Sequence, residues 1–412
     1  MSDTPKSLAE AAANWNNHLA ESNAELERIQ REIDDIAYEL YGIGDEDRKA
    51  IEAMLGQGAA AKSEATEEEE GAEEEEDGEE EEAGPSADPY TLVSEFLDYS
   101  VGCAFGRWDI RCATGEKPEP PEPDPFDPLP VCAPGMLQNS AGLPAEEKDV
   151  PKGYPLRITW PGILVDDEGH PEDIVARVRE AIAVMWGERA EAIEQEACEM
   201  LGVGSMRDYF QKPTLYFNEH LKRHSKSRRK APIYWPLTSP KGGYTLWFYY
   251  HRLTDQSLHT AIADFVDPKQ KSVARELAML RESNASRNRI EPLEDLAKEL
   301  LEFRAELERI SQLPWKPDLN DGVLITASPL WKLFRFGPWQ KELKACWQKL
   351  ERGDFDWAHL AYTIWPARVE QVVKKDRSIA IAHNLEHLCE VEAPKAKEKK
   401  ARKKKGDTSA KS

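Results

Sequence analysis

The stretch KRHSKSRRKAPIYWPLTSPKGGYTLWFYYHRL, from Lys222 to Leu253, contains the clearest β-strand signal in the chain. Bulky residues alternate in PIYWPL, SPKGG is typical of a turn, and YTLWFYY has high β propensity. These patterns predict a β-hairpin over residues 232–250. Because helical patterns dominate elsewhere, we expect a mainly α fold with a small β-hairpin or sheet.

Apolar residues recur at helical spacing through much of the chain. Between residues 9 and 55 they approximate a heptad seam, which predicts a helical hairpin or coiled-coil arm interrupted at Tyr41-Gly42. The seam consists of Leu19, Leu26, Ile29, Ile33, Ile36 and Leu40. Further helices are expected at Pro89–Gly106, His170–Leu201, Ser257–Asp264, Pro338–Leu350 and Arg368–Lys375, with a helical hairpin at Pro268–Leu313 broken near Ser283–Pro292.

The acidic balance of the chain is concentrated in one segment. Glu64 to Glu82 holds 14 acidic residues and no Lys or Arg, and without it the formal net charge of −23 becomes −9. A run of this composition repels itself and cannot bury a core, so we expect a disordered insert over residues 58–88. The Lys-rich tail, residues 393–412, is also expected to be disordered. It could add affinity for phosphates or simply be solvated.

These features divide the chain into six parts. They are a helical arm (1–57), the acidic insert (58–88), a helix with a Pro-rich segment (89–150), a helical region with the hairpin that is the candidate DNA-contacting part (151–313), a Trp-rich region (314–392) and the basic tail (393–412).

The sequence is typical of a cytoplasmic protein. It has no apolar run long enough to span a bilayer and no secretory signal at its start, so we expect no membrane partner. The six cysteines show neither metal-ligand spacing nor a disulfide framework, so we expect reduced thiols and no metal site. His220 and His224 are four residues apart, but Arg223 and Lys226 beside them would repel a cation. The pattern favours a surface pair.

Motifs that would indicate catalysis are not found in the sequence. It contains no phosphate-binding loop, no HExxH and no GxSxG. It also lacks the glycine-rich donor loop and the Asn/Asp/Ser-Pro-Pro-aromatic motif of methyltransferases that act on an extruded base. Gly202-Val203-Gly204 follows a helical pattern and is interpreted as a helix stop. We therefore assign no catalytic residue.

The basic run that precedes the hairpin is the candidate binding site. Lys and Arg neutralise phosphates and aromatic rings stack on bases, which favours nucleic acid, although the aromatics could instead form core beside a solvated basic loop. The candidate DNA-binding residues are Lys222, Arg223, Lys226, Arg228, Arg229 and Lys230, with Lys241 in the hairpin turn.

The tryptophans and tyrosines of the chain are interpreted mainly as core. In the hairpin, alternate residues of a strand face opposite ways, so only one set could reach DNA. The hairpin aromatics in question are Tyr234, Trp235, Trp247 and Tyr249. Five tryptophans of the C-terminal region, Trp331, Trp339, Trp347, Trp357 and Trp365, are interpreted as packing residues.

Several segments, in order along the chain, resemble the C-terminal part of large adenine-specific DNA methyltransferases. The resemblance is to type IIG restriction–modification enzymes and, more closely, to the methyltransferase of phage-exclusion (BREX) systems. The segments are EIDDIAYELYGIGDEDRKAIE (Glu32–Glu52), LVSEFLDYSVGCAFGRWDI (Leu92–Ile110), Arg229–Leu258, Asp321–Val369 and KKDRSIAIAH (Lys374–His383). The second of these contains the family's Gly-Cys-x-Phe-Gly-Arg pattern, at residues 102–107.

The resemblance implies the DNA-recognition and spacer portion of such an enzyme, because the family's catalytic motifs lie upstream of the matching part. It implies that a separately encoded catalytic subunit or domain binds S-adenosylmethionine and methylates adenine N6, with no cofactor held by this chain. The chain would be a split subunit or a gene fragment. The alternative is a helical scaffold protein that binds other proteins through its seam and does not bind DNA.

Overall fold

The computed structural model describes residues 5–51, 88–118, 126, 128–226, 229–313 and 315–390. Within these residues helices predominate and strands are few, which confirms the predicted mainly α fold with a small β part. The predicted basic tail and all of the predicted acidic insert except Asp88 lie outside the described residues, as does the candidate Arg228.

Seven helices in this part of the chain are longer than ten residues. They are α1 (Leu8–Tyr41), α3 (Pro89–Ala104), α5 (Ile174–Trp186), α6 (Ala190–Leu201), α10 (Asp267–Glu282), α11 (Arg287–Ser311) and α13 (Gly337–Arg352). The shorter helices are α4 (Ile110–Ala113), α7 (Met206–Gln211), α8 (Tyr216–Arg223), α9 (Ser257–Thr260), α12 (Val323–Ala327), α14 (His359–Ile364), α15 (Pro366–Val373) and α16 (Arg377–Ala382).

The predicted hairpin forms two strands of a three-stranded antiparallel sheet. Strand β4 (Tyr234–Thr238) pairs with β5 (Thr245–Tyr249), which confirms the hairpin. On its other side β5 pairs with β1 (Ile163–Asp166), a strand that the sequence analysis did not predict. Because β4 lies at the edge of the sheet, Pro236 can occupy it without losing a hydrogen bond to a second neighbour.

Both faces of this sheet are covered, and every residue of β4 and β5 is buried. Tyr234 packs against Phe105 at the end of α3, with ring centroids 5.3 Å apart. Trp235, its neighbour, packs against Tyr250 and Phe334. The hairpin aromatics are therefore core, as interpreted from the sequence. Neither alternating set is exposed, because helices and loops cover each face.

The hairpin turn is held by a buried carboxylate from α11. Glu299 accepts hydrogen bonds from the Ser239 hydroxyl and from the backbone N–H groups of Lys241 and Gly243. Gly242 has φ of +93°, and a Cβ atom there would collide with the Arg335 guanidinium. Glycine is required at this position both by the left-handed backbone and by the close approach of Arg335.

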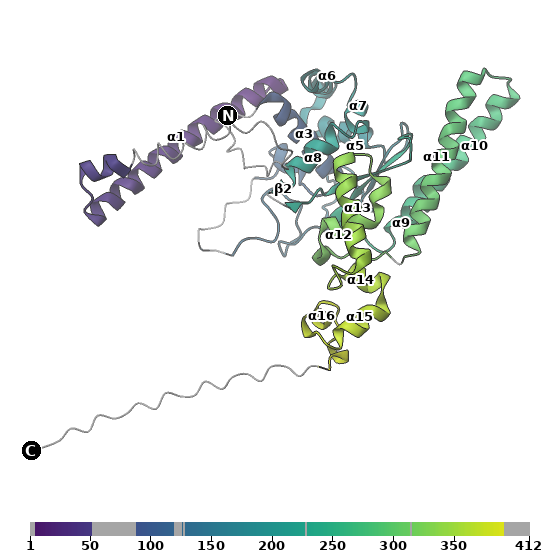
Figure 1. Ribbon diagram of the computed structural model, residues 1–412. Coiled ribbons are helices and arrows are strands. Elements are labelled where there is room, and N and C mark those ends of the chain that lie inside the picture. The colour runs from purple at the N-terminus through teal and green to yellow at the C-terminus, as the bar shows by residue number, and fades with distance from the viewer. Residues whose placement is uncertain are drawn as a thin grey trace, which may run out of the picture.

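Two helical arms extend from the body in Figure 1, α1 on one side and the α10–α11 hairpin on the other. Helix α1 ends at Gly42, whose φ of +67° forms the expected left-handed stop. Its 34 residues correspond to a length of about 51 Å. Leu8 and Ala12 are its buried residues, whereas most of the predicted seam is exposed, up to 77% at Leu40. The α10–α11 hairpin confirms the predicted break after residue 282.

The helix predicted from His170 to Leu201 is divided in two. Helix α5 ends at Gly187, where φ of 58° and ψ of −128° interrupt the helix, and α6 then packs back against α5. The Gly202 stop is confirmed, with φ of +65°. None of the described helices combines the length and the apolar composition that a bilayer crossing requires.

Candidate nucleic-acid interface

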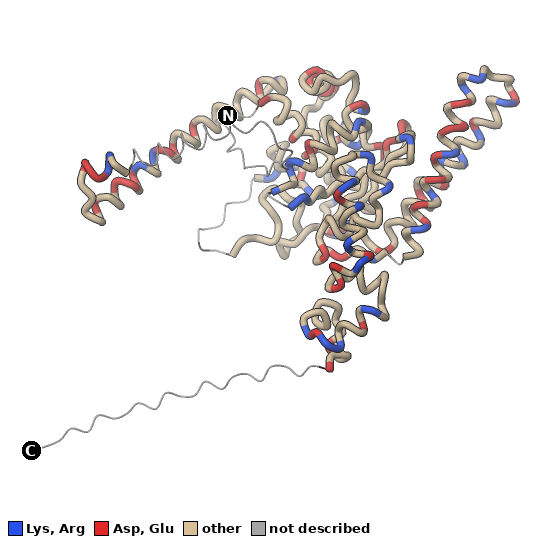
Figure 2. The backbone as a smooth tube through the Cα atoms, viewed as in Figure 1, with Lys and Arg blue, Asp and Glu red and all other residues tan. Residues whose placement is uncertain are grey.

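The basic run forms a small β-ribbon at the end of α8. Strand β2 (Ser225–Lys226) pairs antiparallel with β3 (Arg229–Lys230). The register places Lys226 opposite Arg229, and both side chains are exposed. Figure 2 shows Lys and Arg gathered where Figure 1 labels β2. The sequence predicts a basic run here but not a paired ribbon.

The structure brings some of the candidate residues together and separates others. Lys226, Arg229 and Lys230 share the ribbon, and Lys230 also forms a 2.9 Å ion pair with Glu342 of α13. Lys222 precedes them on the last turn of α8, with its side chain 66% exposed. Lys241 lies in the hairpin turn, at the far end of β4 from the ribbon, and pairs with Asp295 of α11 at 3.0 Å.

Arg223 points inward rather than toward solvent. Its guanidinium lies 3.5 Å from a carboxylate oxygen of Asp98 and 3.8 Å from one of Glu95, and it donates to the hydroxyl of Ser94. Its partners are therefore three residues of α3. Arg223 ties the start of the ribbon to that helix.

His220 is the centre of the polar network beneath the ribbon. Its Nε2 accepts hydrogen bonds from the backbone N–H groups of Ile233 and Tyr234, both at 3.0 Å. Nε2 must then be unprotonated, so Nδ1 carries the proton and donates to Asp98 at 2.7 Å. Burial opposes ionisation of Asp98, but interactions with His220 and Arg223 outweigh it and hold the pKa of that carboxyl well below its ordinary value.

The expectation of a surface histidine pair is wrong. The His220 side chain is fully buried, and the rings of His220 and His224 lie 4.2 Å apart. Their nitrogens and the Asp98 carboxylate are close enough to hold a metal ion. However, His224 Nδ1 bonds to the carbonyl of His220 and its Nε2 faces Arg107. With each ring nitrogen already engaged, the geometry is that of a hydrogen-bond network rather than a metal site.

Arg107 is a candidate contact that the sequence analysis missed. It ends the Gly-Cys-x-Phe-Gly-Arg segment and lies half-buried, with its guanidinium 4.6 Å from the centre of the Trp108 ring. One of its nitrogens is 3.4 Å from Nε2 of His224. Burial is the main cause that lowers the pKa of His224 to about 4, and the charge of Arg107 contributes. His224 is therefore neutral at pH 7 and can accept the hydrogen bond from Arg107.

A second arginine stacks on an aromatic ring close by. The guanidinium of Arg252 lies 4.3 Å from the centre of the Trp160 ring. A Cβ atom on Gly106, next to Arg107, would come within 3.1 Å of an Arg252 nitrogen. Two of the segments that carry the resemblance thus meet at these arginines. The sequence signal was the arginine of the Gly-Cys-x-Phe-Gly-Arg pattern, which only the fold connects to the ribbon.

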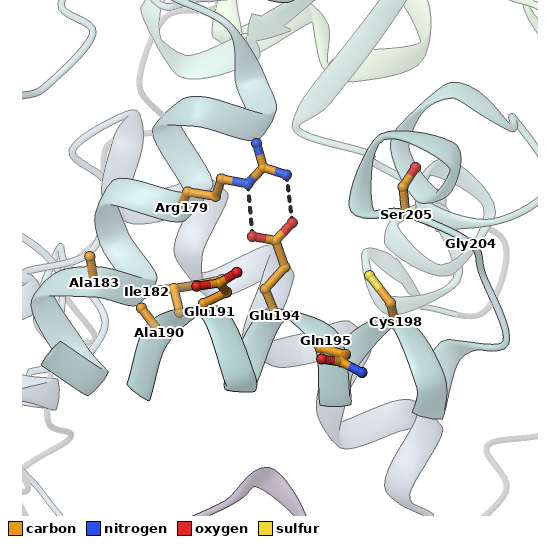
Figure 3. Close-up of a pocket in the computed structure, with 10 residues that line it drawn as sticks. All are labelled: Arg179, Ile182, Ala183, Ala190, Glu191, Glu194, Gln195, Cys198, Gly204 and Ser205. Carbon is orange, nitrogen blue, oxygen red and sulfur yellow. Dashed lines mark hydrogen bonds and ion pairs between the residues drawn. The ribbon is translucent and has the colours of Figure 1, made fainter. Parts of the chain in front are cut away.

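A groove between α5 and α6 is spanned by an ion pair. It encloses about 600 Å³, and Figure 3 shows Arg179 directed across it toward Glu194. That bidentate ion pair has both N–O distances at 2.7 Å. Burial raises the pKa of the Cys198 thiol at the same groove, which keeps the sulfur protonated and poorly nucleophilic.

Comparison with known proteins gives two distant relatives, and no family model matches the chain. An adenine-specific methyltransferase, PglX, from Lacticaseibacillus casei (strain Zhang) is 23% identical over 259 residues. Another, BrxX, from Escherichia coli O9:H4 (strain HS), is 27% identical over 256 residues. The chain is distantly related to adenine-specific methyltransferases. Each match covers 57% of this chain and only 19% of the relative, so the chain spans about a fifth of their length.

Proposed function

We propose that this chain is the DNA-recognition part of a site-specific adenine-N6 DNA methyltransferase from a phage-defence or restriction–modification system. Catalysis and S-adenosylmethionine would be supplied by a separately encoded catalytic subunit or domain. The observation that carries the proposal is the β-ribbon, where Lys226, Arg229 and Lys230 are presented on two short paired strands. The distant relationship to two adenine-specific methyltransferases supports the reaction class.

The ribbon has the form and charge of a DNA-contacting element. A two-stranded antiparallel ribbon is narrow enough to enter the major groove, and lysine and arginine side chains neutralise the phosphates beside it. Arg229 has no ion-pair partner among the described residues, so its charge is available to a ligand. Arg107, stacked on Trp108 and 3.4 Å from the ring of His224, adds positive charge at the base of the ribbon.

Contacts with α3 and with the chain that enters β4 hold the ribbon in place, as a specific contact with DNA requires. Arg223 and His220 connect it to Asp98 of α3, and the two backbone N–H groups bound by His220 belong to the chain that leads into β4. A ribbon held at both ends loses less conformational entropy on binding than a mobile loop would.

The test is duplex DNA binding measured by fluorescence anisotropy over a range of salt concentrations. The triple variant Lys226→Ala, Arg229→Ala, Lys230→Ala should bind more weakly and lower the salt slope by about three, one for each phosphate contact removed. The matched control removes three exposed charges from the α10–α11 hairpin, Arg281→Ala, Arg287→Ala and Lys298→Ala. Equal losses in both triple variants would reject a ribbon-specific contact.

A second candidate function is favoured by the exposed seam of α1. Leu26, Ile33 and Leu40 present large apolar side chains to solvent at heptad spacing, and such stripes mark protein interfaces. A scaffold protein would form an oligomer that Ile29→Glu with Ile36→Glu dissociates, and it would be indifferent to DNA.

A further inference from the structure

A cavity of about 300 Å³ lies between the end of α11, the 3-10 helix η6 (Ser328–Leu333) and α13. It is on the other flank of α13 from the ribbon. Glu342, which pairs with Lys230, and Lys344, which lines the cavity, are two residues apart and therefore about 200° apart around the helix. The cavity is thus separate from the ribbon surface. Its lining includes Arg309, Trp331, Lys332, Lys344, Trp347 and Glu351.

Two tryptophans line this cavity without being fully buried. Trp331 and Trp347 pack against the main core on one side and keep exposed surface on the other. Trp339, on the same α13 helix, is completely buried and serves packing alone. From the sequence, all three are interpreted as packing residues. The structure shows that two of them also present indole surface to a cavity, where a flat ring can stack.

Cations surround the exposed indole of Trp331. The ammonium nitrogen of Lys344 lies 5.0 Å from its ring centre and that of Lys332 lies 5.9 Å away. Lys344 has no carboxylate at ion-pair distance in the described part of the chain. Glu306, outside the lining, pairs with two of the cations. Arg309 donates to it at 2.8 and 2.9 Å, and the ammonium nitrogen of Lys332 lies 3.6 Å from one of its oxygens. Glu351 is the one acidic residue in the lining, so the lining has a positive excess.

We propose that this cavity binds a single nucleotide unit, with the base stacked on the exposed indole surface and the phosphate held by Lys344, with Lys332 as a second cation nearby. Stacking on tryptophan combined with lysine contacts to phosphate is how proteins hold unpaired nucleotides without reading their sequence. The volume suits one nucleotide rather than a longer chain, since it lies at the lower end of small-ligand sites. The nucleotide comes either from solution or from a single strand.

The inference goes beyond the proposed ribbon contact, and the two can fail independently. Binding of dAMP to the full chain would be measured by isothermal titration calorimetry. Lys344→Gln and Trp347→Ala should each weaken binding at least tenfold. The matched controls are Lys349→Gln, an exposed lysine on the same helix, and Trp357→Ala, an exposed tryptophan that does not line the cavity. Both controls should bind as the natural sequence does.

Three further titrations sharpen the result. Adenosine, which lacks the phosphate, should bind at least tenfold more weakly than dAMP and should not respond to Lys344→Gln. A five-residue oligo(dA) that binds more tightly than dAMP identifies a single strand as the source, whereas equal affinity identifies the free nucleotide. The ribbon triple variant should lose duplex binding and keep dAMP binding. The proposal is overturned if dAMP does not bind, or if Lys344→Gln and Lys349→Gln bind it equally.

Discussion

Asp98 of α3 and His220 of α8 are joined by a 2.7 Å hydrogen bond although 122 residues separate them in the chain. Both side chains are buried. The other ring nitrogen of His220 receives two backbone N–H groups from the segment that enters β4. The His220 imidazole thus connects helices α3 and α8 to the segment that leads from the ribbon into β4. The position of the ribbon therefore depends on this side chain.

Replacing His220 with Ala should destabilise the fold strongly. The change leaves two buried N–H groups without an acceptor and removes a partner from a buried carboxylate. We expect the free energy of unfolding to fall by about 3 kcal/mol. Urea unfolding followed by circular dichroism measures it. His259→Ala, at an exposed histidine, should change it by less than about 0.5 kcal/mol. Similar values for the two variants would show that the network contributes little.

Acid should destabilise the protein through His224. Its pKa is lowered to about 4 in the fold, below the ordinary value of 6.5, so the folded state holds this ring neutral while the unfolded state binds a proton. The stability that neutral His224 supports is complete above pH 6.5 and is lost as the pH falls toward 4. His224→Gln should flatten the decline in that window, because an amide does not titrate. Midpoints of urea unfolding at pH 7, 6, 5 and 4.5 test this, and parallel curves for the two proteins would contradict it.

Arg107 should contribute to duplex binding by its charge. Arg107→Ala is expected to weaken binding several-fold and to lower the salt slope by about one. Arg107→Lys should keep the slope, since it keeps the charge, while losing the planar stacking on Trp108. Arg287→Ala removes a charge from a side chain that is 86% exposed on α11 and should leave binding unchanged. Fluorescence anisotropy at four salt concentrations distinguishes the three variants, and an unchanged slope in Arg107→Ala would exclude a phosphate contact.

Glu299 should be required for the hairpin turn. Glu299→Gln replaces one acceptor oxygen with a donor and removes the charge that three turn groups share. We expect a loss of about 2 kcal/mol in the free energy of unfolding, measured by urea denaturation. Glu302→Gln, on the same helix and exposed beside Lys298, is the matched control and should cost less than about 0.5 kcal/mol. If both variants unfold at the same urea concentration, the turn does not depend on this carboxylate.

Local signals were sufficient for many of the elements. The alternation of PIYWPL, the SPKGG turn and the aromatic YTLWFYY predicted β4 and β5, because strand and turn propensities act within a few residues. Gly42 and Gly202 marked helix ends because their left-handed backbone is nearly free of strain only for glycine. Strand β1 escaped prediction, since three apolar residues followed by Asp166 become a strand only when β5 lies beside them.

The candidate site likewise combines features set by local sequence with features set only by tertiary contacts. The sequence by itself determined where positive charge is dense along the chain and that the aromatic hairpin beside it would fold as β structure, because composition and short-range pattern decide both. Only the tertiary structure decided that Arg223 turns inward to Asp98, that His220 is buried and that Arg107 reaches His224. These contacts join residues more than one hundred positions apart, and no local pattern records which distant groups satisfy a buried polar side chain.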